Sequence, residues 1–214
     1  MVRELVKPAT GGVRRLPMSY GEFLERFDEN AHVEWVNGEA IVHMPPVEPH
    51  QDVVTLLVTL LRFYVDLRGL GMVLTAPFEL RLPTGSSREP DILFLSREHY
   101  DRRTRERWIG AADLLVEVQS DRTAKYDLHE KLLDYLRAGV REYWAIDSRP
   151  RVRSFRAFLL TESGQYDEAT LDERGRFRST VLPGFWLDPS WFWQDPLPAT
   201  VDLLMEIAPD AFGR

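Results

Sequence analysis

The stretch LLVEVQSDRT, residues 114–123, has the pattern of a buried β-strand with two polar side chains set into it. Side chains alternate along a strand, so one face carries only leucine and valine, and the other carries Leu115, Glu117 and Gln119. A carboxylate and an amide on one face of so apolar a strand raise the question of a functional site at its end.

Two further stretches have the pattern of strands, EPDILFLS (89–96) and REYWAIDS (141–148), and the strand quoted first extends over 112–120. A helix is predicted over about 124–138, between the strands at 112–120 and 141–148. A connection that contains a helix is long enough to join parallel strands. The sequence therefore predicts an α/β fold, with a mixed β-sheet flanked by helices.

The N-terminal part carries the clearest local signals. Residues 1–18 contain several prolines and glycines and are expected to form a mostly irregular lead-in. A capping-box pattern predicts a short helix over 19–28. Asn37-Gly38 between two alternating runs predicts a two-residue β-hairpin, and the apolar segment 49–68 predicts a buried helix.

The remainder of the chain, after residue 148, is expected to contain antiparallel strands and a proline-rich tail. Neither repeats nor low-complexity segments interrupt the sequence, and its 214 residues are enough for one large domain. We therefore expect a single domain over 19–195 and a C-terminal tail over 196–214.

The composition indicates a folded, cytoplasmic protein. The sequence is 44% hydrophobic, which supports a packed core, and it has no cysteine, which excludes disulfides, zinc–thiolate sites and cysteine nucleophiles. The N-terminus lacks the apolar segment of a secretory signal, and the longest apolar stretch is too short to span a bilayer. We expect no membrane partner.

The net charge of −7 weighs against bulk electrostatic attraction to nucleic acid. It weighs less against an enzyme that brings divalent cations to its site. The usual signatures of nucleotide cradling, dinucleotide binding, α/β-hydrolase chemistry and zinc proteases are missing, and the five histidines are scattered without metal-ligand spacing. Carboxylates are therefore the remaining candidates for catalytic or metal-binding residues.

Two carboxylates are placed to converge. Asp91 follows Pro90 at the start of one predicted strand, and Glu117 lies in the middle of another. If these strands are neighbours, Asp91 and Glu117 meet at one end of the sheet, where they form a hard-oxygen site suited to Mg²⁺ or Mn²⁺. The alternative is that Glu117 is a solvated or salt-bridged strand residue and Asp91 only a turn residue.

Three separated segments occur in the order typical of a known family: EPDILFLS, ADLLVEVQSDRTAKYDLHEKLLDYLRAGVREYWAIDS and STVLPGFWLD. Together they resemble the Uma2 family, restriction-endonuclease-like proteins of the PD-(D/E)XK nuclease superfamily, over residues 20–193. The resemblance implies a restriction-endonuclease-like αβββαβ core, with an N-terminal β-hairpin and additional C-terminal strands. It also implies that Asp91 and Glu117 are metal ligands.

The chain departs from the superfamily pattern at Gln119, where a lysine is usual. Glutamine can orient a water by hydrogen bonds but supplies no cation. Lys131 matches a lysine of the Uma2 pattern and is a candidate to replace this charge, and Lys125 is a second candidate. The alternative for Lys131 is a surface salt bridge with Asp127, four residues earlier on the same helix.

Three further side chains have open interpretations. His50 matches a histidine of the Uma2 pattern and could contact phosphate or carry a proton, or it could be a helix-start residue bonded to the backbone. Glu34 and Glu39 lie on the mixed face of the predicted hairpin. Either could reach the site, although strand carboxylates are usually exposed.

These observations lead to the hypothesis of a divalent-metal-dependent endonuclease that hydrolyses DNA phosphodiester bonds. Asp91 and Glu117 would bind Mg²⁺ or Mn²⁺, Gln119 would position the attacking water, and Lys131 would stabilise charge on the phosphate. Cutting both strands would favour a homodimer. The alternative is a non-catalytic interaction or nucleic-acid-binding module that keeps the nuclease-like fold, and RNA or branched DNA are alternative substrates.

Overall fold

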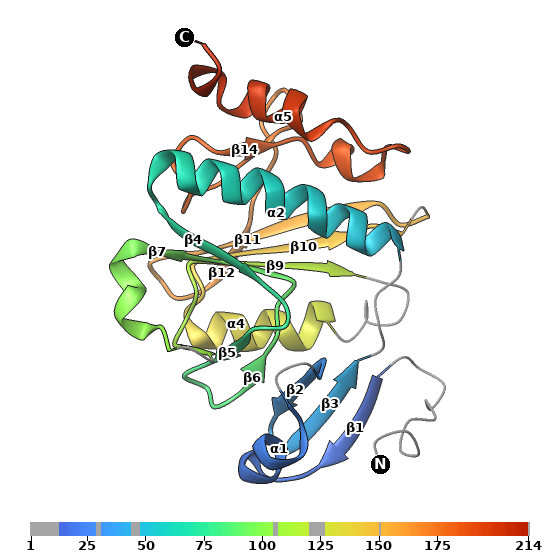
Figure 1. Cartoon of the computed structure of the whole chain (residues 1–214), viewed down its shortest axis with the longest axis vertical. Helices are drawn as coiled ribbons and strands as arrows, with labels where there is room; N and C mark the ends of the chain where they lie inside the picture. The colour runs from blue at the N-terminus through green and yellow to red at the C-terminus, as the bar shows by residue number, and fades with distance from the viewer. Residues whose placement is uncertain are drawn as a thin grey trace.

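The centre of the molecule is a mixed sheet with helices on both faces (Figure 1). The computed structural model describes residues 13–28, 31–43, 48–104, 107–119, 127–149 and 151–213. In spatial order the central sheet contains six strands: β12 (Tyr166–Glu168), β11 (Ser154–Leu160), β10 (Glu142–Asp147), β9 (Leu114–Gln119), β7 (Ile92–Ser96) and β4 (Gly71–Thr75). Strands β9 and β10 are parallel, and the other neighbouring pairs are antiparallel.

Two helices cover the two faces of this sheet. The long helix α2 (Glu48–Arg68) lies on one face, and α4 (Leu132–Ala138) lies on the other, between β9 and β10 in the chain (Figure 1). A π-helical turn, η2 (Asp127–Lys131), leads into α4. The predicted crossover between parallel strands and the predicted long helix are therefore confirmed.

The alternation within β9 also agrees with the prediction. Val116 and its even-numbered neighbours pack into the core beneath α2, whereas Leu115 packs with Tyr135 of α4 on the opposite face. All six residues of β9 are buried, because both faces of the strand are covered. Glu117 and Gln119 therefore lie inside the protein, where an unpaired charge would be costly.

A second, N-terminal sheet lies beside the α4 face (Figure 1). In spatial order its six strands are β1 (Val13–Pro17), β3 (Glu39–His43), β2 (Val33–Val36), β6 (Ser87–Arg88), β5 (Glu79–Arg81) and β8 (Arg107–Ile109). The predicted hairpin joins β2 to β3, and positive φ angles of 49° at Asn37 and 86° at Gly38 suit its two-residue turn. Helix α1 (Tyr20–Arg26) begins after a capping box formed by Ser19 and Glu22, as predicted.

Several helices and strands were not predicted from the sequence. Residues 13–17, in the expected irregular lead-in, form β1 and pair with β3. In the expected tail, α5 (Thr200–Ile207) buries Leu203, Leu204 and Ile207 in the core beside α2. The remaining elements are short: η1 (Arg97–Arg102), β13 (Phe177–Arg178), β14 (Trp186–Leu187), η3 (Pro189–Trp193) and η4 (Pro209–Ala211).

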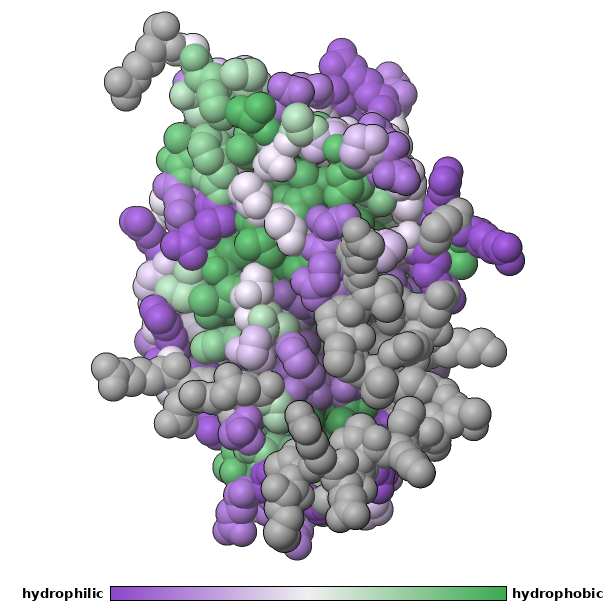
Figure 2. Space-filling view, turned by 45° about the vertical axis from the view of Figure 1, so that its right-hand side comes forward, coloured by the Kyte–Doolittle hydropathy of each residue, from purple (hydrophilic) through white to green (hydrophobic). Residues whose placement is uncertain are grey.

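The C-terminal segments form a layer outside α2 (Figure 1). Figure 2 shows hydrophobic side chains gathered over the upper part of one face, where this layer lies. Val201 and Met205 of α5 are among the exposed large hydrophobic residues. Within the described part of the chain, no helix combines the length and the apolar character needed to cross a membrane.

Gly71, where β4 begins, leaves no room for a side chain beside β7. A Cβ atom there would overlap the carbonyl oxygen of Leu95 and lie 3.0 Å from the ring of Phe94. We therefore expect Gly71→Ala to lower the free energy of unfolding by about 1–3 kcal/mol, measured by urea denaturation. Gly21→Ala in α1 is the matched control, because its Cβ would meet only Ser19 Oγ at 4.0 Å. Equal stability of the two variants would contradict this prediction.

Candidate active site

A cavity of about 380 Å³ lies between the N-terminal hairpin, the start of α2 and the neighbouring ends of β7 and β9. Its lining includes these ionisable side chains: His32, Glu34, His43, His50, Glu89, Asp91, Glu117 and Lys131. The structure therefore brings together His50, Asp91, Glu117 and Lys131, four of the five site residues named from the sequence. Gln119 is not part of the lining.

Asp91 is fixed by the strand next to it. Strands β7 and β9 are antiparallel neighbours, and Asp91 Oδ2 accepts a hydrogen bond of 2.7 Å from the backbone N–H of Val118. Its other oxygen, Oδ1, lies 3.3 Å from His50 Nε2. Asp91 and Glu117 both line the cavity, at the neighbouring ends of β7 and β9, as expected for carboxylates that meet at one end of the sheet.

His50 contacts a side chain of the cavity. Its Nε2 faces Asp91, and its Nδ1 is buried with no hydrogen-bond partner among the described residues. The alternative of a histidine bonded to the helix-start backbone is therefore not seen in this part of the chain. The imidazole is placed to hold or exchange a proton with Asp91 or with a group bound in the cavity.

Glu117 is engaged by two donors on the helix that follows β9. Its Oε1 accepts hydrogen bonds from Lys131 Nζ at 2.9 Å and from the hydroxyl of Tyr135 at 2.6 Å. Burial, and then the charge of Glu117, hold the pKa of Tyr135 well above its usual value, so the phenol keeps its proton and donates. Glu117 is thus a buried, partnered carboxylate.

Lys131 is buried, with 4% of its side chain exposed. Its ammonium lies between two carboxylates, 2.9 Å from Glu117 Oε1 and 3.1 Å from Glu34 Oε1. Lys131 is therefore not the solvent-exposed lysine that a surface pair would need. The Asp127 side chain and Lys125 lie outside what the structure describes.

Glu34, on β2 of the hairpin, is 1% exposed, so the expectation of an exposed strand carboxylate is wrong for it. Beyond Lys131, it accepts hydrogen bonds of 3.1 Å from Arg88 Nη1 and from the backbone N–H of Glu89, and it lies 3.3 Å from His43 Nε2. Burial by itself would raise the pKa of Glu34, but Lys131, Arg88 and His43 outweigh this effect and hold the pKa well below its usual value. Glu34 is therefore ionised at neutral pH.

The pKa of Glu89 is shifted in the opposite direction from that of Glu34. Burial, followed by the repulsion from Glu34, raises the pKa of Glu89 from 4.5 to about 8. This carboxyl is therefore protonated at neutral pH and can donate a hydrogen bond into the cavity. The local sequence REPD gives no sign of this, because the shift depends on a neighbour from the distant hairpin.

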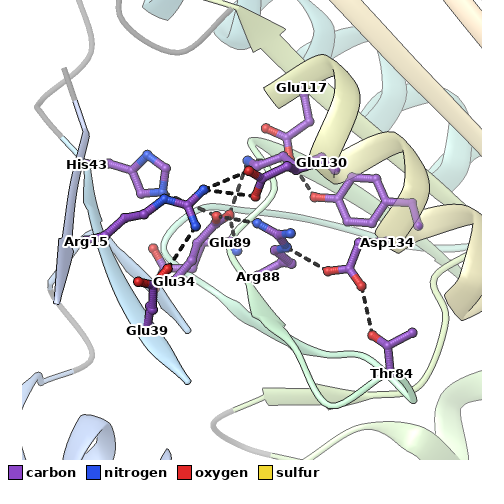
Figure 3. A network of polar contacts seen from close by, with 12 residues as sticks. Arg15, Glu34, Glu39, His43, Thr84, Arg88, Glu89, Glu117, Glu130 and Asp134 are labelled. Carbon is purple, nitrogen blue, oxygen red and sulfur yellow. Dashed lines mark hydrogen bonds and ion pairs between the residues drawn. The ribbon is translucent and has the colours of Figure 1, made fainter. Parts of the chain in front are cut away.

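The network continues away from the cavity in two directions (Figure 3). Arg88 Nε donates to Asp134 Oδ2 at 3.0 Å, and Asp134 Oδ1 accepts from Thr84. On the outer side, the Arg15 guanidinium binds both oxygens of Glu130 at 2.8 and 3.0 Å and also contacts Glu39, as Figure 3 shows. The hairpin and the turn that carries Lys131 are thus tied together at the surface. Glu39 remains partly exposed, at 35%.

Gln119 is buried, and its Nε2 has no hydrogen-bond partner among the described residues. Because the side chain does not line the cavity, the water-positioning role expected for it has no support from its place in the structure. The backbone of Gln119 pairs with Asp147 at the end of the parallel ladder.

The cavity contains ligands for a hard cation but no complete cage. Among the described residues, no three histidine, cysteine, aspartate or glutamate side chains are grouped to hold a metal by themselves. Two carboxylates, Asp91 and Glu117, do face the same space. Mg²⁺ is usually held in proteins by one or two carboxylates, with water and substrate phosphate completing its shell, so this ligand set fits such an ion.

The mixed sheet, with carboxylates at the ends of two adjacent strands and a lysine on the following helix, defines an α/β protein with a cavity lined by carboxylates and one lysine. The sequence matches the Uma2 family, described as "Putative restriction endonuclease", over residues 20–190. This chain therefore belongs to the Uma2 family.

The fold is similar to that in a crystal structure of a putative nuclease belonging to DUF820 from Anabaena variabilis. The TM-score is 0.67 at 18% sequence identity, and the match covers 83% of this chain and 98% of that chain. At this identity the likeness shows the fold alone. No curated protein matches the sequence.

Proposed function

We propose that this protein is a divalent-metal-dependent endonuclease that hydrolyses phosphodiester bonds of DNA. The observation that carries the proposal is the convergence of Asp91, Glu117 and Lys131 on one cavity, from two adjacent strand ends and the next helix. The family description and the nuclease-like fold support it at the level of the class.

The electrostatics of the cavity support a metal requirement. The carboxylates of Glu34, Asp91 and Glu117 line the cavity with one ammonium, that of Lys131, and they outnumber the cations even when Arg88, which contacts Glu34, is counted. Such a cavity repels a phosphodiester unless a cation neutralises part of its charge. Bound by Asp91 and Glu117, Mg²⁺ or Mn²⁺ would polarise a phosphate oxygen and lower the pKa of a water.

The chain's own residues would act around that ion. The N–H of Val118 and the imidazole of His50 orient Asp91, and the Tyr135 hydroxyl orients Glu117. Lys131 is the cation of the cavity lining and would stabilise negative charge on the phosphate. Gln119 has no part in this scheme. Cleavage of both strands would favour a homodimer with paired sites.

Mn²⁺ binding tests the assignment of the two ligands. We expect wild type to bind Mn²⁺, measured by calorimetry with and without a short DNA duplex, and Asp91→Ala and Glu117→Ala to lose that binding. Asp167→Ala, an exposed aspartate on β12, is the matched control and should bind as wild type does. Equal binding by all four proteins would remove the basis of the proposed metal site.

Cleavage by the wild-type protein tests the activity itself. Labelled duplex DNA, single-stranded DNA and RNA would each be incubated with the protein in Mg²⁺ or Mn²⁺. We expect scission of DNA, dependent on the metal and abolished by chelation. Metal binding without scission of any substrate would favour a non-catalytic nucleic-acid-binding module, which the acidic net charge and the glutamine in place of the motif lysine already favour.

A further inference from the structure

The hairpin carboxylate Glu34 belongs to a region of the chain that contributes neither proposed metal ligand. Each of its two oxygens has two polar neighbours: Lys131 and the N–H of Glu89 at Oε1, and Arg88 and His43 at Oε2. Hydrogen bonds and ion pairs from Arg88, Lys131 and the N–H of Glu89 restrict the movement of this carboxylate. Glu34 is therefore a fixed anionic point facing the ammonium of Lys131.

Stability alone gives little reason for such an arrangement. Burying an ion network costs desolvation energy, and well-packed apolar residues of similar size are often at least as stable. A hydrophobic residue at position 34 could dock the hairpin, as Val36 and Ile41 do on the same face. The buried charge at position 34 therefore points to a role of Glu34 in the site.

Lys131 shares its ammonium between Glu117 Oε1 at 2.9 Å and Glu34 Oε1 at 3.1 Å. A divalent cation bound to Glu117 would repel that ammonium, because two positive charges would then compete for one carboxylate. Without a second carboxylate the lysine would either block the cation or leave the cavity. Glu34 supplies this second carboxylate at a distance that already suits an ion pair.

We infer that Glu34 is a positioning residue: it holds the ammonium of Lys131 in the cavity when a divalent cation occupies Glu117. The inference deepens the proposed function and rests on it in one respect, since it takes Glu117 to be a cation ligand. It assigns the N-terminal hairpin a direct part in the site, through a contact with the helix that follows β9.

The first test follows the lysine ammonium without any metal. The sequence contains three lysines, Lys7, Lys125 and Lys131, so ¹⁵N-lysine labelling gives a simple NMR spectrum of the side-chain ammonium groups. We expect the buried Lys131 to give a slowly exchanging signal in wild type and in Glu39→Gln, the matched control on the same hairpin. In Glu34→Gln this signal should shift or broaden beyond detection.

The second test measures Mn²⁺ affinity by calorimetry. In Glu34→Gln the ammonium keeps its contact with Glu117 and opposes the cation there, so affinity should fall about 10- to 100-fold. Glu39→Gln should bind as wild type does. Glu34→Asp keeps the charge with a shorter reach, should recover part of the affinity, and serves as the test variant if Glu34→Gln folds poorly.

The outcomes distinguish failure of the inference from failure of the proposed function. An unchanged ammonium signal, or Mn²⁺ affinity equal in Glu34→Gln and Glu39→Gln, would overturn the inference, because neither the lysine nor the cation site would then depend on Glu34. Failure of wild type to bind Mn²⁺ would overturn it as well. If both effects occur and wild type nevertheless cleaves no nucleic acid, the proposed function fails and the role of Glu34 stands.

Discussion

Asp91→Asn and Glu117→Gln should each hydrolyse duplex DNA at least about 100-fold more slowly than wild type. Both substitutions keep the size of the side chain, and the amide oxygen at position 91 can still accept the hydrogen bond from Val118. What each removes is one negative charge from the pair of carboxylates proposed to hold the metal. The loss therefore reports on charge in the site and not on collapse of the strand ends.

Single-turnover cleavage of a labelled duplex in Mn²⁺ is the appropriate measurement, with DNA binding measured separately by fluorescence anisotropy. We expect the rate of cleavage to fall while DNA affinity changes little, because each substitution alters one side chain inside the cavity and leaves the outer surface of the protein unchanged. Asp167→Asn is the control, since this aspartate is exposed on β12. Cleavage by the two site variants at the rate of Asp167→Asn would rule out the proposed mechanism.

Lys131→Met should lower the free energy of unfolding at pH 7 by about 3–5 kcal/mol. Methionine fills much of the space of the lysine stem, but Glu34 and Glu117 then remain buried without the cation that joins them. Arg62→Met is the matched control, because its ion pair with Asp66 is more than half exposed and should contribute no more than about 0.5 kcal/mol. Urea denaturation of both variants measures the difference.

The destabilisation in Lys131→Met should depend on pH. In wild type the pKa of Glu34 is held below its usual 4.5, so its contribution to stability is complete above that value and is lost as the pH falls through the folded pKa. Lys131 is one cause of this lowering, so its removal reduces that contribution. The stability difference between wild type and the variant should therefore be largest at neutral pH and shrink in acid. A difference that grows in acid would contradict the assignment of Glu34 as the ionised partner.

Much of the fold was predictable because its signals are local. The hairpin follows from Asn37-Gly38, the long helix from its apolar pattern, and the parallel pair from the length of the connection between β9 and β10. The elements that escaped prediction have no such local signal. Strand β8 has three residues and pairs in parallel with β5, and β1 depends on a partner beyond α1.

Individual residues of the site were predictable from the sequence, but their full set of contacts was not. Resemblance to the Uma2 family pointed to His50, Asp91, Glu117 and Lys131, and the structure places all four in one cavity. The burial of Glu34 was not predictable, because the mixed face of the hairpin gains its cover from Arg88 and Lys131, which are distant in sequence. For Gln119, alternation predicted a place on the same strand face as Glu117, but the side chain does not line the cavity.

The contact between Arg15 and Glu130 joins residues 115 positions apart. A contact of such long range requires the entropy of closing the intervening loop to be overcome before it contributes. During synthesis the hairpin with Glu34 leaves the ribosome well before the strand with Glu117 and the turn with Lys131. A nascent chain therefore has no assembled cavity, and the hydrolytic chemistry proposed for it would begin only when the fold is complete.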